Sequence, residues 1–290
     1  MPLYYQARDA EFIDYKPWLI CEKANFFVRG PKLQPADLNQ GNYFSVLGAA
    51  ETVGVLVQTP YGAVLADRIK IPCLNLGKGG GGALFFIRPV MQEVIDYIDK
   101  GKFLILTLMS ARQTSNSLFK SKDGTSQCIY NDVEMLADRA WELIIEAHWH
   151  DKSFLKNFVL EVRETYVNEY LQLLKTVKVP VILFYFSQRK PKYTPGWKKK
   201  QARSIWAKFP HLVDQQTIKK ILAQAHVTYA KCVSRRGIPY TLKDKTGQEK
   251  PLWEPTQKKF QKFHSYYPSP EMHEDAAKVL LPICRKILQW

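Results

Sequence analysis

The sequence predicts an α/β fold in which helices cover both faces of a mainly parallel sheet of five strands. Five short apolar runs alternate with segments of helical spacing, and three of the runs end in loops of small or polar residues. Such alternation is typical of parallel sheets, whose strands are buried on both faces. With 46% hydrophobic and 24% charged residues, the 290-residue chain can bury a sizeable core, which excludes a disordered or disulfide-dense protein.

The predicted strands are short apolar runs that end at turn signals. They lie at residues 43–47, 72–76, 103–109, 179–186 and 227–233. The run VPVILFYF is uniformly apolar and is therefore expected in the centre of the sheet. Helical spacing predicts helices at residues 60–69, 90–100, 133–150, 154–176, 213–224 and 270–289.

We expect one domain with two additions. Residues 1–42 are rich in proline and aromatic residues and lack periodicity, which predicts an irregular segment packed on the domain. Residues 43–290 form the α/β domain itself. Residues 187–213 interrupt it as a basic insertion with eight Lys or Arg residues.

The strongest departure from average composition is the charge. The chain has 42 Lys and Arg against 27 Asp and Glu, which gives +15 and an isoelectric point near 9.5. This favours an anionic partner: nucleic acid, an anionic membrane surface, a nucleotide donor or an acidic glycan. Residues 187–213 and 243–262 mix the excess charge with Trp197, Trp206 and Trp253, so they are either solvated loops or a surface for an anionic ligand that contains a ring. No sequence signature of nucleic-acid binding accompanies them, and nucleic acid is not the expected partner.

Cysteine usage and the N-terminal residues bear on the compartment. The five cysteines are scattered, and no Cys/His cluster has zinc spacing, so we expect free thiols in a reducing compartment and no metal site. Arg8, Asp9 and Glu11 stand where a signal peptide needs an apolar run. No stretch approaches the ~20 apolar residues of a membrane span. We therefore expect a cytoplasmic protein without a transmembrane segment, and leave its oligomeric state open.

The first candidate loop follows the first predicted strand, at residues 48–54 (GAAETVG). Loops at the carboxyl ends of parallel strands carry function, and small residues let backbone N–H groups face an anion. Gly48, Thr52 and Gly54 are therefore candidate binding residues, although a tight turn between strand and helix has the same composition. The loop lacks the Lys-Ser/Thr ending of an ATPase loop. Glu51 is a candidate to accept a proton or to orient a substrate hydroxyl.

Two further loops carry candidate residues. After the second strand, Lys78 precedes four glycines, whose backbone freedom suits either close approach to a ligand or a flexible solvent loop. After the third strand, the loop SARQTSNS contains Arg112, Ser115 and Asn116. Arginine with hydroxyl donors is typical of phosphate or sulfate binding, while Ser115 or Asn116 could also cap a helix.

These blocks resemble the SGNH-hydrolase superfamily. In that pattern Gly-Asp-Ser-x-Thr-x-Gly follows the first strand, Asn-x-Gly the second and Gly-x-Asn-Asp the third, and Asp-x-x-His opens the last helix. Here the corresponding stretches are residues 48–54, 75–77 (NLG), 112–116 and 270–273 (PEMH). The resemblance spans residues 43–290 and implies a three-layer, SGNH/flavodoxin-like sandwich. The chain also resembles an uncharacterised bacterial branch associated with surface-polysaccharide loci.

Two departures from the family pattern affect the expected chemistry. Ala50 stands at the nucleophile position and Pro270 at the position of the triad aspartate. Alanine cannot form an acyl-enzyme, so the usual serine esterase chemistry is excluded. His273 and Asn116 remain at their family positions, and His273 keeps one possible base.

A weaker resemblance concerns the donor. Arg112 followed by Ser115 is similar to the 3′-phosphate grip of sulfotransferases, which bind phosphoadenosine phosphosulfate (PAPS). The lysine of their first phosphate loop is missing from residues 48–54, and Lys78 could substitute for it. Coenzyme A carries the same 3′-phosphoadenosine group and is the second expected donor.

Taken together, these features predict a group transferase that acts on a hydroxyl of a glycan or similar acceptor. PAPS is favoured over an acyl-CoA as nucleotide donor, and its phosphates would bind to Gly48, Thr52, Gly54, Lys78, Arg112, Ser115 and Asn116. His273 or Glu51 would take the acceptor proton, and residues 189–208 would cover the site or hold the acceptor. One alternative is an SGNH-like hydrolase or esterase whose nucleophile is Ser110 or Ser115. The other is a non-catalytic glycan- or nucleotide-binding protein.

Overall fold

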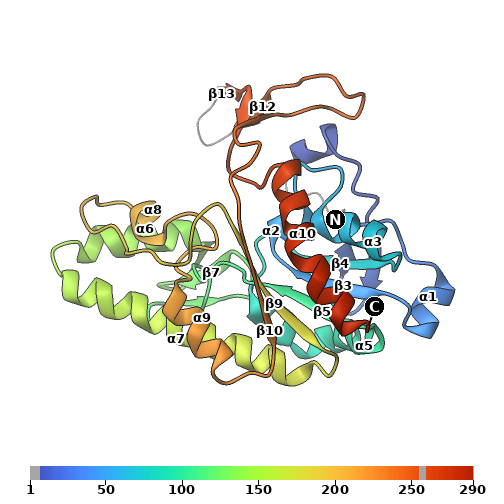
Figure 1. Ribbon diagram of the computed structural model, residues 1–290. Helices are drawn as coiled ribbons and strands as arrows, with labels where there is room; N and C mark the ends of the chain where they lie inside the picture. Colours follow the sequence, from blue (N-terminus) through green and yellow to red (C-terminus); the bar gives the residue numbers. More distant parts are fainter. Residues whose placement is uncertain (1–6, 255–258, 290) are drawn as a thin grey trace.

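The centre of the molecule is a parallel β-sheet (Figure 1). The computed structural model describes residues 7–254 and 259–289, and within them the sheet has five strands in the order β4-β3-β5-β9-β10. The strands are β3 (Phe44–Gly48), β4 (Cys73–Gly77), β5 (Leu104–Thr107), β9 (Val181–Ser187) and β10 (Thr228–Val233). In chain order this is the doubly wound arrangement whose topological switch point lies between the first and third strands, here β3 and β5.

Helices cover both faces of the sheet (Figure 1). One face is covered by α3 (Tyr61–Ile69) and α10 (Pro270–Ile287), and the other by α5 (Gln92–Lys100), α6 (Ala137–His148), α7 (Lys152–Thr176) and α9 (Gln215–Leu222). Side chains of β9 alternate between the faces: Ile182 and Phe184 pack under α3 and α10, whereas Leu183 and Tyr185 pack on the opposite side. Burial on both faces explains why this strand is apolar throughout.

The fold class predicted from the sequence is confirmed. Each of the five predicted strands is present within two residues of its expected start, and β9 lies inside the sheet between β5 and β10. The predicted helices at 60–69, 90–100, 154–176, 213–224 and 270–289 correspond to α3, α5, α7, α9 and α10. Gly101 ends α5, as expected of a glycine at that position.

Smaller elements complete the described chain. Near the N-terminus are η1 (Ala7–Glu11), β1 (Trp18–Cys21), β2 (Phe26–Val28) and α1 (Pro35–Gln40). Short helices follow at α2 (Ala50–Val53), α4 (Ala83–Ile87), η2 (Pro89–Met91) and α8 (Ala202–Trp206). Short strands are β6 (Phe119–Ser121), β7 (Gln127–Tyr130), β8 (Val133–Leu136), β11 (Tyr240–Thr241), β12 (Leu252–Glu254), β13 (Lys259–Gln261) and β14 (Phe263–His264).

Two predictions about local structure were wrong. The helix predicted from residue 133 begins only at Ala137, because residues 133–136 form β8 and pair with β7. Asn131 and Asp132, both with positive φ, make the two-residue turn that joins these strands. The N-terminal segment, expected to be irregular, contains the antiparallel pair β1–β2 and helix α1.

The described part of the N-terminal segment packs on the domain. Phe12, Ile13 and Tyr15 are buried against Val53 and Leu56 in a small apolar cluster beside α2. The boundary between this segment and the α/β domain stays a prediction, and residues 1–6 lie outside the described structure. Among the described residues, no helix combines the length and the apolar character that a membrane crossing requires.

Candidate functional site

The loop after β3 is held at the switch point by contacts between three hydroxyl groups. The Thr52 Oγ1 atom lies 3.3 Å from the Tyr61 hydroxyl, which in turn lies 2.8 Å from Thr107 Oγ1 at the end of β5. All three side chains are buried. A Cβ added at Gly48 would lie 2.1 Å from Thr52 Oγ1. Gly48 is therefore required by the packing of this loop on its own threonine.

Gly54 and its neighbours serve the backbone of the same loop. Gly54 has φ +73° and ends α2, where its N–H donates to the carbonyl of Ala50. Its own carbonyl accepts a hydrogen bond from the buried guanidinium of Arg29, which also binds the carbonyls of Val53 and Val57. The glycines at both ends of residues 48–54 thus have a structural explanation in the fold.

Glu51 is enclosed behind this loop. Its side chain is 3% exposed, and its Oε1 atom accepts a hydrogen bond from the Ala49 N–H at 3.1 Å. Burial raises the pKa of Glu51 to about 8, so the carboxyl is mostly protonated at neutral pH. A protonated carboxyl can donate a proton, whereas the predicted role for Glu51 was to accept one.

His273 lies in the apolar layer between α3 and α10. Its ring is fully buried, stacks on Tyr61 and contacts Phe186, and its Nδ1 atom accepts a hydrogen bond from the Tyr61 N–H at 3.0 Å. Burial, with a smaller contribution from Arg29, lowers the pKa of His273 to about 3. The neutral ring then carries its proton on Nε2. In this arrangement His273 is an acceptor for the first turn of α3, and its role as a base stays a prediction.

The glycine run after β4 is covered by protein. Gly82 donates its N–H to the carbonyl of Gly124 at 2.8 Å, and the carbonyl of Gly81 accepts from the Gln113 side chain at 3.0 Å. Lys78 at the start of the run is partly buried, and its Nζ lies 5.5 Å from the centre of the Phe85 ring. Burial lowers the pKa of Lys78. The close approach that these glycines allow is therefore to the segment between β6 and β7.

Ser115 and Asn116 shape the third loop. The Ser115 Oγ atom accepts a hydrogen bond from the Ser121 N–H at 2.9 Å. The Asn116 amide donates to the carbonyl of Thr114 and accepts from the N–H groups of Leu118 and Phe119, each at 3.0 Å. Both side chains are therefore engaged with the backbone of the loop. The helix cap expected as the alternative is not what they form, because this loop leads into the strand β6.

Arg112 points from the third loop toward α6. Its Nε atom lies 3.1 Å from Asp138 Oδ1, and its guanidinium lies 5.8 Å from the centre of the Trp206 ring. The carbonyl of Arg112 accepts a hydrogen bond from the buried Trp141 indole at 2.8 Å, which fixes the backbone. Arg112 thus contacts side chains of α6 and α8.

A serine and a histidine meet beside Arg112. The Ser110 Oγ atom lies 3.2 Å from His211 Nδ1, and Ser110 and His211 are 5% and 6% exposed. The Ala111 N–H donates to the His211 carbonyl at 3.0 Å, so backbone and side chain of His211 are both held by the third loop. Burial, then the charges of Arg112, Arg189 and Arg203, lower the pKa of His211 well below 6.5, which keeps its ring neutral.

The basic insertion holds His211 at the carboxyl end of β9. Ser187 donates its hydroxyl to the Phe209 carbonyl at 2.6 Å. The guanidinium of Arg189 donates to the carbonyls of Lys208, Pro210 and Val213. Arg189, predicted to be part of a ligand cover, therefore fixes the backbone on both sides of His211.

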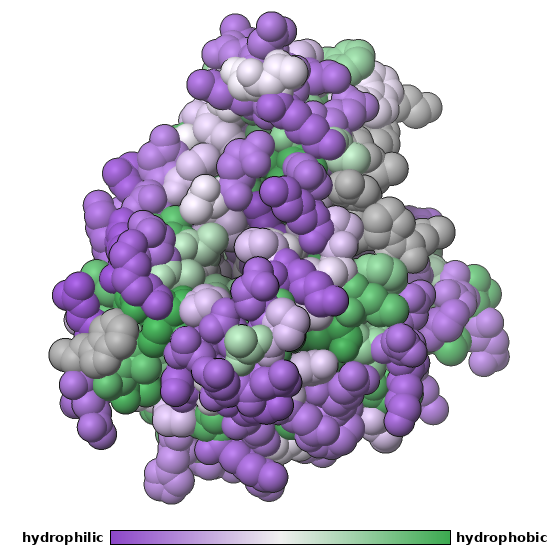
Figure 2. Space-filling model, turned by 90° about the vertical axis from the view of Figure 1, so that its right-hand side faces the viewer, coloured by the Kyte–Doolittle hydropathy of each residue, from purple (hydrophilic) through white to green (hydrophobic). Residues whose placement is uncertain are grey.

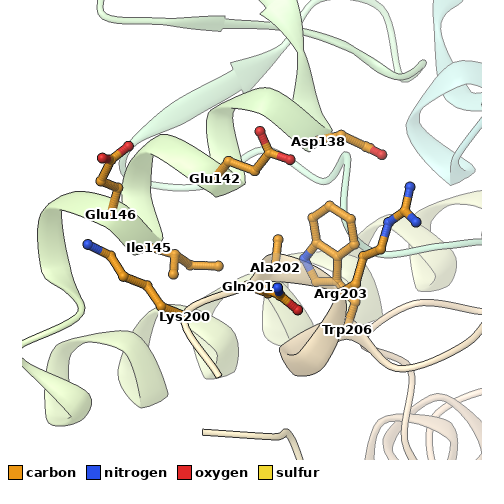
Figure 3. Close-up of a pocket in the computed structure, with 9 residues that line it drawn as sticks. All are labelled: Asp138, Glu142, Ile145, Glu146, Lys200, Gln201, Ala202, Arg203 and Trp206. Atoms are coloured by element: carbon orange, nitrogen blue, oxygen red, sulfur yellow. The ribbon is translucent and has the colours of Figure 1, made fainter. Parts of the chain in front are cut away.

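A groove of about 580 Å³ lies between α6 and α8, next to this pair. Figure 3 shows carboxylates on one wall and basic side chains on the other. The acidic wall consists of Asp138, Glu142 and Glu146, which follow one another at four-residue spacing on α6; the other wall includes Lys200 and Arg203. Trp206 lines the groove, and its ring contacts His211 with a centroid distance of 5.7 Å.

The structure thus separates the sequence-predicted residues into two groups. Gly48, Glu51, Thr52 and Gly54 form the loop after β3, which contacts His273 through Tyr61. The Lys78 N–H donates to the Gly48 carbonyl at 2.9 Å. Arg112, Ser115 and Asn116 belong to the other loop. Their assignment to one phosphate site and one proton acceptor stays a prediction. Within the described ranges, no three Cys, His, Asp or Glu side chains gather as a metal site.

Sequence reasoning named Ser110 but missed His211. The two residues are 101 positions apart, and His211 belongs to no motif, because it lies within the basic insertion and not directly after a strand. The only local signal is Phe209-Pro210-His211, which breaks the charge run after Lys208. That signal indicates a turn and gives no indication of a partner for Ser110.

The comparisons with known proteins give one family model. A domain of unknown function, DUF6473, matches residues 3–123. No curated protein matches the sequence.

Solved structures to which this chain is similar include esterases and hydrolases. A family two carbohydrate esterase from Clostridium thermocellum, in complex with cellohexaose, is 8% identical, with 91% of this chain and 68% of that chain covered and a TM-score of 0.43. A carbohydrate esterase family 2 enzyme from Corynascus thermopiles is 12% identical, with 91% and 70% covered and a TM-score of 0.38. A candidate SGNH hydrolase from Slackia heliotrinireducens is 11% identical, with 83% and 98% covered and a TM-score of 0.39. These structural neighbours are SGNH-hydrolase and carbohydrate-esterase proteins, and the family model names no activity.

Proposed function

We propose that the protein is an ester hydrolase in which Ser110 is the nucleophile and His211 its general base. The observation that carries this proposal is the 3.2 Å contact between Ser110 Oγ and His211 Nδ1 at the carboxyl edge of the sheet. Ser110 follows β5, one of the two strands that flank the switch point, where ligands of doubly wound sheets bind. A serine in hydrogen-bond contact with a fixed imidazole is the arrangement that activates a hydroxyl for attack.

The reaction follows from this contact. Ser110 Oγ attacks the ester carbonyl carbon while its proton passes to His211 Nδ1, and the ring keeps its own proton on Nε2. The tetrahedral intermediate collapses by breaking the bond to the alcohol oxygen, which receives the proton from His211. Water then attacks the acyl group on Ser110 with the same base and releases the acid. The Arg112 N–H donates to Ser110 Oγ at 3.3 Å and fixes the position of the attacking oxygen.

The charges around His211 favour an anionic substrate. An imidazolium is disfavoured here, because the ring is buried and Arg112, Arg189 and Arg203 act on it. An anionic group bound near Arg112 and Arg203 offsets these charges and makes His211 a stronger base. The groove adds acidic and basic side chains that can form hydrogen bonds, and the indole of Trp206. Such a lining suits a sugar. We therefore propose an ester of an acidic glycan as substrate class.

Hydrolysis of an aryl ester such as p-nitrophenyl acetate, without any donor, tests the proposal. Ser110→Ala and His211→Gln should each lower kcat/KM by about a hundredfold or more, which is the usual contribution of a general base and its nucleophile. A fluorophosphonate should label the wild-type chain on Ser110, as read by mass spectrometry of peptides. Ser115→Ala is the matched control, because this serine belongs to the same loop but accepts from the backbone of Ser121.

Folding is monitored through the melting temperature of each variant. Equal hydrolysis by wild type and Ser110→Ala, with label on neither, would overturn the proposal. Absence of hydrolysis by the wild type would favour the binding-protein alternative. Loss of activity in Ser115→Ala but not in Ser110→Ala would move the nucleophile to Ser115.

Transfer from a 3′-phosphoadenosine donor remains a separate prediction with its own test. The side chains that would bind the phosphates, Ser115 and Asn116 among them, make hydrogen bonds within their own loop. No observation therefore favours transfer over hydrolysis. A thermal-shift panel with adenosine 3′,5′-bisphosphate, coenzyme A and ATP measures binding by mass action. Stabilisation by the first two ligands that is lost in Arg112→Ala would support it, and a flat panel would remove it.

A further inference from the structure

A short hairpin projects from one end of the molecule, away from the sheet. Figure 1 shows β12 and β13 at the tip, beyond the N-terminal end of α10. The hairpin and the strand β14 that follows carry three large exposed side chains, Trp253 at 41%, Phe260 at 66% and Phe263 at 53%; Tyr266, two residues after β14, is 52% exposed. Aromatic rings are normally buried or half-buried, so four of them on one projection indicate an interaction surface.

The rings are held by local structure. Trp253 and Phe260 are opposite each other in the β12–β13 register, with ring centroids 5.1 Å apart. Phe263 belongs to β14, which pairs with β11, and Tyr266 packs edge-on against the buried Tyr267. Such anchoring fixes the rings on the surface without covering them, so little side-chain entropy is lost when they bind a partner.

Lysines accompany the rings. Lys259 and Lys262 are exposed on the same short stretch, and Lys262 Nζ lies 5.7 Å from the centre of the Phe263 ring. Lys243 and Lys245 are exposed on the neighbouring turn, where Asp244 accepts hydrogen bonds from the turn itself. In Figure 2 the corresponding end of the molecule is mostly hydrophilic, with pale and light-green residues among the purple ones. Lys258, part of the same charge run, lies outside the described residues.

We propose that this tip surface, defined as Trp253, Lys259, Phe260, Lys262, Phe263 and Tyr266, binds the surface of an anionic lipid bilayer. Aromatic rings partition into the headgroup region of a bilayer, and lysines beside them contact anionic headgroups. The shape favours a bilayer over a nucleic acid. A single strand is usually held in a basic groove, whereas the tip is a projection.

Sedimentation with lipid vesicles tests this proposal. The full chain should bind vesicles that contain phosphatidylserine and phosphatidylcholine, and bind vesicles of phosphatidylcholine alone more weakly. Each lysine near an anionic surface contributes about fivefold in affinity, so Lys259→Gln/Lys262→Gln should bind about 25-fold more weakly. Added salt should weaken binding of the wild type more than binding of this variant.

The rings are tested with Phe260→Ser/Phe263→Ser, which should also lose binding by at least tenfold, since two exposed rings no longer enter the headgroup region. Leu160→Ser is the matched control for exposed apolar area, because Leu160 is 53% exposed on α7. Lys120→Gln/Lys156→Gln is the matched control for charge, because both lysines are exposed elsewhere. Both controls should bind as the wild type does.

Several outcomes would overturn the proposal. They are absence of vesicle binding, binding that the tip variants leave unchanged, and binding that falls equally in tip and control variants. Tight binding of a fluorescent single-stranded oligonucleotide that the tip variants abolish, without vesicle binding, would assign the surface to nucleic acid instead. The proposal is independent of the hydrolase: Ser110→Ala should bind vesicles as the wild type does.

Discussion

Single residues in the loop after β3 are determined by packing more than by ligand chemistry. The sequence singled out Gly48, Thr52 and His273, and in the structure they are linked through Tyr61, whose hydroxyl lies near Thr52 and whose N–H donates to His273. The types and positions of these residues were predictable from the motif order. Their burial was not, because it depends on α10 closing over α3, two helices that are about 200 positions apart in the chain.

Substitution of Gly48 tests this packing. Gly48→Ala puts a Cβ 2.1 Å from Thr52 Oγ1 and 2.9 Å from Thr107 Cβ, and the loop must shift. We expect a loss of about 1–3 kcal/mol in the free energy of unfolding, as measured by urea denaturation. Gly82→Ala is the matched control, since its nearest contact is a side-chain nitrogen of Gln113 at 3.2 Å. An unchanged midpoint in Gly48→Ala would contradict the role given to this glycine.

At the level of elements, local signals predicted the strands and helices that form the central sandwich. They did so because burial on two faces imposes apolar runs on parallel strands. The three-stranded sheet β6-β7-β8 was missed, since its strands are three or four residues long and mostly exposed, with Val133 and Leu136 among the exposed side chains. Such strands leave no apolar periodicity to read.

The N-cap residue of α10 is expected to contribute to the stability of the fold. Ser269 is buried at its N-cap, accepts from the Met272 N–H and donates to the Arg236 carbonyl at 2.6 Å. Ser269→Ala removes both hydrogen bonds and should lower the free energy of unfolding by about 1–2 kcal/mol in urea denaturation. Asp151→Ala at the N-cap of α7 loses one bond to Phe154 and should cost about half as much. The reverse order would show that the Arg236 contact contributes little.

At the scale of the whole molecule, buried ionisable groups predict how stability depends on pH. Burial raises the pKa of Glu51 and of Glu169 to about 8 from 4.5, so the folded chain holds protons that the unfolded chain releases. Above pH 6.5 stability should therefore fall toward pH 8, by about 1.4 kcal/mol per pH unit for each group. His273, with a pKa of about 3, and His211 act in the opposite direction, because the unfolded chain binds their protons below 6.5.

Urea denaturation over a pH series measures this balance. Between pH 4.5 and 6.5 the two effects oppose each other; below pH 4.5 the histidines should lower stability. Glu51→Gln removes one of the two alkaline contributions and should reduce the slope above pH 6.5 by about half. A slope that is the same in this variant would contradict the raised pKa of Glu51.

The sequence by itself determined the positions of the elements: the five apolar strands, the helices between them and the polar loops at their ends. Each of these is encoded by residues that are close together in the chain. It also determined the excess of basic charge. Only the tertiary structure decided which polar side chains meet. The chain returns from β9 through the basic insertion before His211 reaches Ser110, and α10 closes over α3 to enclose His273. Contacts between residues 101 and 212 positions apart depend on how layers pack, and no local pattern records that packing.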